Sequence, residues 1–80
     1  MSRRLPSLSG AQLMAALRRA GFQDAPRRGK GSHHALVRRD AAGRTRLVIV
    51  SDRKDVPRGT LLSILEMAGL SREEFLALLR

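Results

Sequence analysis

The chain has no cysteine, tryptophan or tyrosine, and Phe22 and Phe75 are its aromatic residues. The absence of cysteine excludes disulfides and thiolate metal sites. With two histidines as the remaining strong metal ligands, we expect no metal ion and no other cofactor. Proteins that bind single-stranded nucleic acid usually stack the bases on exposed aromatic side chains. That mode of binding is therefore disfavoured.

The sequence also lacks a long apolar run. No segment approaches the roughly 20 apolar residues that a membrane-spanning helix needs. The first ten residues, MSRRLPSLSG, hold two arginines without an apolar stretch after them, which is not the pattern of a secretory signal. We expect a cytoplasmic protein without membrane contact. Its 80 residues suit one domain, which we place at 9–80 after a flexible lead at 1–8.

Acidic residues are scarce in the middle of the chain. The net charge is +9, from 16 Lys and Arg against 7 Asp and Glu. Residues 27–58 hold ten basic and three acidic residues, a net of +7, whereas residues 59–80 have a net of −1. A basic patch of this kind attracts polyanions, of which nucleic acid is the usual one. The alternative interpretation is a solvated surface in a protein from an arginine-rich organism.

The periodicity of the apolar residues predicts two main helices and a short third one. Ser9 with Gln12, and Ser71 with Glu74, have the spacing of capping boxes, in which a serine and a glutamine or glutamate three residues later bond each other's backbone N–H. The helices are expected at 9–21, at 59–69 and in the turn or two after residue 71.

Three strands are expected between the first two helices, at 22–28, 33–39 and 44–50. Pro26 favours an edge position for the first strand, and the β-branched end of the third suggests a buried one. Asp40–Gly43 is expected to be a hairpin connection. The result is an α+β fold of order α-β-β-β-α, with both helices on one face of a three-stranded antiparallel sheet. This order of elements is that of double-stranded-RNA-binding domains (dsRBDs).

His33 and His34 are the two histidines, and they follow a glycine-rich basic turn. Imidazole suits proton transfer in RNA cleavage, since both of its protonation states are accessible near neutral pH. Successive side chains of a strand point to opposite faces, so His34 is expected to face away from any site that contains His33. For His34 we favour a packing or surface role.

Basic and hydroxyl side chains near His33 are candidates for binding phosphates. Arg27, Arg28 and Lys30 precede it directly, and Ser32 is its neighbour. Gly59 and Thr60 begin the expected second helix, whose free N–H groups are a plausible phosphate site. A plain N-cap at Thr60 is the simpler interpretation of that segment.

Three segments of the chain resemble the HicA toxin family: LRRAGF at 17–22, GSHH at 31–34, and GTLLSILEMAGLSREEFLALL at 59–79. The resemblance implies a dsRBD-like fold and an endoribonuclease that cleaves mRNA, the toxin of a type II toxin–antitoxin system acting in stress response. It also implies a HicB-like antitoxin that covers the active site. The toxin would then be a monomer when alone and part of a hetero-oligomer with the antitoxin. The catalytic histidine of the family directly follows Gly-Ser, which corresponds to His33.

The segment after the third strand departs from the family pattern. Relatives often carry Val-Pro-x-His there, whereas this chain reads Val-Ser-Asp-Arg at 50–53. Arg53 and Lys54 can hold phosphates, but an arginine does not transfer protons at neutral pH. A non-catalytic RNA-binding module of dsRBD shape is therefore the alternative function. A basic protein associated with ribosomes or DNA is a third one, and it rests on charge alone.

Overall fold

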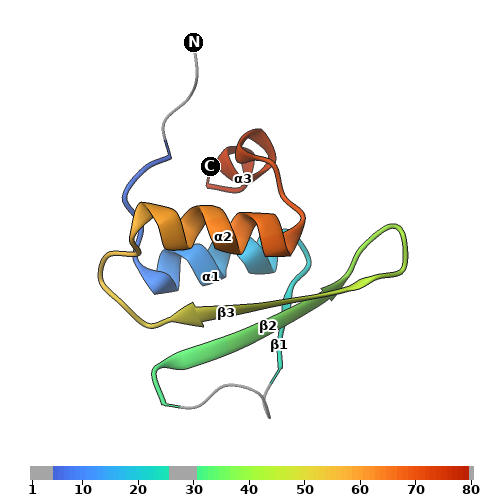
Figure 1. Cartoon of the computed structure of the whole chain (residues 1–80), viewed down its shortest axis with the longest axis horizontal. Helices are drawn as coiled ribbons and strands as arrows, with labels where there is room; N and C mark the ends of the chain where they lie inside the picture. The colour runs from blue at the N-terminus through green and yellow to red at the C-terminus, as the bar shows by residue number, and fades with distance from the viewer. Residues whose placement is uncertain (1–4, 26–30, 80) are drawn as a thin grey trace.

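The computed structural model describes residues 5–25 and 31–79, and these form an α+β fold (Figure 1). The elements in chain order are α1 (Gly10–Arg19), β1 (Gln23–Asp24), β2 (His33–Arg39), β3 (Thr45–Ser51), α2 (Arg58–Ala68) and α3 (Arg72–Leu78). The order α-β-β-β-α predicted from the sequence is confirmed, and α3 is the short third helix. None of the helices in these residues is long and apolar enough to cross a membrane.

The three strands form one antiparallel sheet in the order β1-β2-β3. Figure 1 shows α1 and α2 side by side on the same side of this sheet. Between the layers lies a core to which every layer contributes buried apolar side chains, among them Leu13, Leu17, Leu36, Val48, Val50, Leu61, Leu65 and Phe75. Burial of these side chains is the main stabilising contribution to the fold. The other face of the sheet carries no helix among the described residues.

Both predicted capping boxes are present. The Ser9 side chain accepts a hydrogen bond from the Gln12 N–H, and the Gln12 side chain accepts one from the Ser9 N–H. Ser71 and Glu74 make the same pair of bonds at the start of α3. These bonds satisfy N–H groups that have no partner inside the helix, which fixes where α1 and α3 begin.

α2 begins one residue earlier than the predicted start at Gly59. The helix begins at Arg58 with Pro57 at the N-cap, and no side chain makes a capping hydrogen bond there. The interpretation of Thr60 as N-cap is therefore wrong, and Thr60 lies in the first turn. Pro57 is extended, with φ −56° and ψ 144°, as is usual for the residue that precedes the first helical one.

Two predictions about the strands need correction. The described part of the first strand is shorter than 22–28: β1 covers Gln23–Asp24, one further backbone bond joins the Ala25 N–H to the Ala35 carbonyl, and 26–30 lie outside the described residues. Its edge position is confirmed. The prediction of a buried third strand is also wrong. β3 is the other edge strand of the sheet. One of its faces is open, since Ile49 is 43% exposed. Its β-branched run covers one buried and one open face.

Asp40 holds the hairpin between β2 and β3. Its backbone N–H donates to the Arg44 carbonyl at 2.8 Å, and its carbonyl accepts from the Gly43 N–H at 2.9 Å. Its side chain accepts bonds from the Ala42 and Arg44 N–H groups. Gly43 has a φ of +82°, as the predicted hairpin connection required. This is a three-residue loop of the type-I-turn-plus-bulge kind, and it sets the pairing of the two strands.

The segment before α1 packs on the domain. Leu8 is buried in the core, Leu5 packs against it, and the Val56 N–H donates to the Leu8 carbonyl at 2.7 Å. The boundary between a lead and the domain at residue 9 stays a prediction, but Leu8 already belongs to the core.

Candidate active site

His33 is an exposed residue at the start of β2, on the sheet face that the helices leave open. The assignment of faces follows from alternation along the strands. Leu36, Val48 and Val50 are buried against the helices, and His34 pairs with Val50. His34 is therefore half-buried on the helix side, and His33 points the other way. The prediction that the two histidines face opposite sides is confirmed.

Ser51 is the residue directly opposite His33 on β3. Hydrogen bonds from the Asp52 N–H to the Ser32 carbonyl and from the Asp40 N–H to the Arg44 carbonyl mark the bonded pairs of this ladder. Because bonded and non-bonded pairs alternate, His33 and Ser51 form a non-bonded pair. In such pairs the Cα atoms are about 4.5 Å apart and the side chains approach closely on one face. Ser51 is thus the cross-strand neighbour of His33 on this face of the sheet.

Gly31 turns the chain into β2. Its φ is +59°, and a Cβ at this position would meet nothing within 4 Å. The glycine is therefore needed for its backbone conformation and not for space. It places Ser32 at the end of the ladder and leaves His33 exposed as the first residue of the strand.

The start of α1 and the segment after β3 are joined at the same end of the sheet. The Gly10 N–H donates to the Arg53 carbonyl at 2.8 Å, and the Arg53 N–H donates to the Ser51 carbonyl at 2.9 Å. A Cβ on Gly10 would collide with the Ser51 carbonyl oxygen, so this contact requires glycine. The side chains of Arg53 and Lys54 are exposed. The structure thus holds Ser32, His33 and Arg53 at one end of the β2–β3 pair.

The remaining predicted site residues are placed differently. Thr60 is exposed in the first turn of α2, an element that the other candidates do not share. Arg27, Arg28 and Lys30 lie outside the described residues. The roles predicted for all of these residues in RNA binding stay predictions.

Sequence reasoning missed Ser51 and Gly10 as neighbours of the candidate site. The expected strands at 33–39 and 44–50 would have placed His33 opposite Val50. The structure begins β3 one residue later and pairs His33 with Ser51. The aspartate and glycine of the loop were the available indication, since they are typical of a three-residue connection.

Two carboxyl groups away from this end have lowered pKa values. The Arg44 N–H, the Arg46 side chain and the Ala42 N–H lower the pKa of Asp40 below its usual 3.8. Hydrogen bonds from Ser71 lower the pKa of Glu74. Both shifts come from turn and cap geometry, so they concern stability and not the chemistry at His33.

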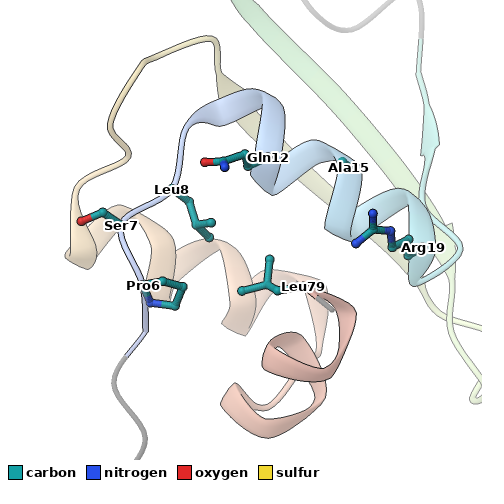
Figure 2. Close-up of a pocket in the computed structure, with 7 residues that line it drawn as sticks. All are labelled: Pro6, Ser7, Leu8, Gln12, Ala15, Arg19 and Leu79. Carbon is teal, nitrogen blue, oxygen red and sulfur yellow. The ribbon is translucent and has the colours of Figure 1, made fainter.

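A hollow of about 390 Å³ lies elsewhere on the molecule (Figure 2). Figure 2 shows side chains of α1 facing Leu79 and the segment before α1; the lining residues are Pro6, Ser7, Leu8, Gln12, Ala15, Arg19 and Leu79. None of them is a predicted site residue. His33 lies instead on an open surface, which suits a polymeric substrate better than an enclosed small molecule. Within residues 5–25 and 31–79, no three His, Asp or Glu side chains gather as metal ligands would.

The fold and the exposed basic end around His33 define a small α+β domain of the dsRBD-like kind. Residues 10–70 match the family described as HicA toxin of bacterial toxin–antitoxin systems. Because the match covers more than half of the chain, the protein belongs to the HicA toxin family, as the three sequence segments predicted. No curated protein matches the chain.

Proposed function

We propose that this protein is an endoribonuclease toxin that cleaves mRNA, with His33 transferring a proton in the reaction. The observation that carries the proposal is the position of His33 in a chain of the HicA family: it is exposed, on the open sheet face, at the end of the sheet where Ser32 and Arg53 also lie. We place the protein in the cytoplasm, where its substrate is made.

The chemistry needs one bond formed and one broken at phosphorus. The 2′-hydroxyl loses a proton and its oxygen attacks the adjacent phosphorus, while the bond from phosphorus to the 5′-oxygen breaks. The departing 5′-oxygen gains a proton, which leaves a 2′,3′-cyclic phosphate and a 5′-hydroxyl. His33 serves one of these two proton transfers, because imidazole exchanges protons near neutral pH. Water serves the other, which predicts a slow enzyme.

We expect the basic side chains near His33 to bind the phosphates of the RNA substrate. Arg53 and Lys54 are exposed after β3, and Arg27, Arg28 and Lys30 precede His33 in the sequence. Their charge attracts the RNA backbone and offsets the negative charge that builds up on the phosphate in the transition state. A HicB-like antitoxin of opposite charge would cover this surface, since charge complementarity speeds and orients docking.

Binding of RNA without cleavage is the second candidate function. The arginine at position 53 supports it, because a guanidinium holds a phosphate but does not transfer protons at neutral pH. The two functions differ in what His33 contributes. A binding module needs the positive surface and is indifferent to the imidazole.

The test is induced expression of the wild type, His33→Ala and His34→Ala in bacteria. Growth and the appearance of new mRNA 5′ ends are measured together. His34 is the matched control, because it is the adjacent histidine on the opposite face. We expect growth arrest and new ends from the wild type and His34→Ala, and neither from His33→Ala. Full toxicity of a stably folded His33→Ala variant would overturn the catalytic role.

A further inference from the structure

β3 is an edge strand with one free side. In the order β1-β2-β3, its partner is β2, and the described residues place no strand beyond it. It is as long as β2, running from Thr45 to Ser51. Edge strands expose a row of backbone N–H and C=O groups to which another chain can bond.

The pairing with β2 shows which backbone groups face outward. The bonds that join Asp52 to Ser32 and Asp40 to Arg44 make the even-numbered residues of β3 the ones that bond β2. The odd-numbered residues therefore turn their N–H and C=O groups to the free side. Among the described residues, one of these outward backbone groups has a hydrogen-bond partner. The Ser51 carbonyl accepts a bond from the Arg53 N–H. The amides of Thr45, Leu47 and Ile49 are left for a partner.

The side chains at these positions do not protect the edge. By alternation they lie on the open face, where Leu47 is half-buried and Ile49 is 43% exposed. Natural edge strands are usually shielded by lysine, proline, a bulge or an inward charge. From Thr45 to Ser51 the single charged residue is Arg46, and its guanidinium is bonded to Asp40 at 3.0 Å. An unshielded edge with apolar side chains is typical of a strand that pairs with another protein.

We propose that the free edge of β3 binds an extended, acidic-ended segment of the antitoxin as a fourth strand. The identification of the partner rests on the proposed function. A second copy of this chain is disfavoured because each copy carries a charge of +9. Cations stand at both ends of the edge, with Arg44 before it and Arg53 and Lys54 after it. A segment with apolar residues at alternate positions and aspartates at its ends complements this pattern.

The position of such a strand explains how it would inhibit. Neighbouring strands lie about 4.8 Å apart, so the added strand would lie roughly 10 Å from β2. Its side chains on the open face would stand beside Ser51, the cross-strand partner of His33. Bound there, the segment crowds the surface that RNA must reach.

The test uses the purified wild-type protein and a synthetic peptide, Asp-Val-Thr-Val-Thr-Val-Asp. Amide exchange is followed residue by residue by NMR. We expect slower exchange at Leu47 and Ile49, weaker binding by the same peptide with lysine ends, and none by a peptide N-methylated on the bonding edge. Unchanged exchange at about 1 mM peptide would overturn the proposal. So would equal binding of the N-methylated peptide, since that indicates docking on the sheet face.

A pair of variants at position 49 provides the second arm. Ile49→Ala and Ile49→Pro both remove the exposed side chain, but the proline also removes the outward N–H without breaking a bond to β2. We expect Ile49→Ala to bind the peptide within about tenfold of wild type, and Ile49→Pro to lose binding. Equal binding by the two would contradict strand addition. If Ile49→Pro does not fold, the N-methylated peptide decides. Neither the amide-exchange nor the peptide-binding measurement depends on RNA cleavage. Strand addition can therefore be tested even if the protein proves not to be a ribonuclease.

Discussion

His33 and Ser51 face each other across β2 and β3, as a non-bonded pair on the open face of the sheet. Two features hold this pair in place. The hairpin at Asp40 sets the register of the strands, and the start of α1 packs against the Ser51 carbonyl. The position of the candidate catalytic residue therefore depends on residues at both ends of the hairpin.

Gly10→Ala is expected to destabilise the protein, because its Cβ would collide with the Ser51 carbonyl oxygen. The control is Gly59→Ala, also in the first turn of a helix, where a Cβ would meet nothing within 4 Å. Gly59→Ala should be neutral or stabilise by up to about 1 kcal/mol, since alanine favours helix. Urea unfolding of both variants measures this difference, and equal stabilities would contradict the packing described for Gly10.

Asp40 makes stability depend on acidic pH. Because its pKa is lower in the folded chain than its usual 3.8, the ionised carboxylate stabilises the fold above that value. The stabilisation is lost as the pH falls through the lowered folded pKa. Asp40→Asn keeps an acceptor for the loop N–H groups and removes the charge beside Arg46. We expect Asp40→Asn to be less stable than wild type at neutral pH, with a smaller further loss in acid.

Unfolding by urea at neutral pH and near pH 3 checks this pH dependence. Glu74 also has a lowered pKa, so Asp40→Asn should retain part of the acid sensitivity. Asp40→Ala should be less stable than Asp40→Asn at both pH values, because it also loses the bonds to the Ala42 and Arg44 N–H groups. The same acid profile for wild type and Asp40→Asn would show that the carboxylate contributes nothing.

Arg38 joins the carboxyl ends of both long helices. Its guanidinium donates to the Ala20 carbonyl at 3.0 Å and to the Ala68 carbonyl at 3.4 Å, and it lies 5.0 Å from the centre of the Phe22 ring. A cation at a helix C-terminus is favourable. Arg38→Met should therefore cost about 1–2 kcal/mol of stability.

Arg39→Met is the control for Arg38, because Arg39 is the exposed neighbour on the opposite face. Its unfolding midpoint in urea should match that of the wild type. A loss in Arg39→Met as large as that in Arg38→Met would mean that general charge, and not the helix ends, is responsible.

Arg53 and Lys54 are expected to contact phosphates of the RNA. The double variant Arg53→Ala, Lys54→Ala should weaken binding and make it less sensitive to salt, because each lost phosphate contact reduces the salt slope by about 0.7 for single strands. Filter binding of one mRNA over a range of salt concentrations measures the slope. Arg72→Ala, an exposed arginine at the start of α3, should leave it unchanged. A slope that falls equally in both variants would assign binding to overall charge.

Much of the fold follows from local sequence. The serine caps and the alternation in β2 are each specified within a few residues, so their positions were predicted correctly. Opposite orientation of His33 and His34 follows from the same alternation. These features depend on short-range bonds and on a period of two, and neither needs knowledge of the tertiary structure.

What sequence reasoning missed depends on contacts between distant segments. The pairing of His33 with Ser51 depends on a one-residue difference in the loop at Asp40, which shifts every cross-strand pair. Gly10 meets Ser51 because α1 crosses the end of β3, which the sequence does not reveal. The β-branched run of β3 suggested a buried strand, but a strand at the edge of a sheet covered on one side has the same composition.

Whether His33 is catalytic is decided by cleavage of one long mRNA with purified wild type, His33→Ala and His34→Ala, with both new ends identified. We predict cleavage by wild type and His34→Ala that leaves 2′,3′-cyclic phosphate ends. His33→Ala should cleave about 10²–10⁴-fold more slowly while still binding the RNA. Equal cleavage by His33→Ala, or RNA binding by the folded wild type without any cleavage, would contradict the catalytic role of His33.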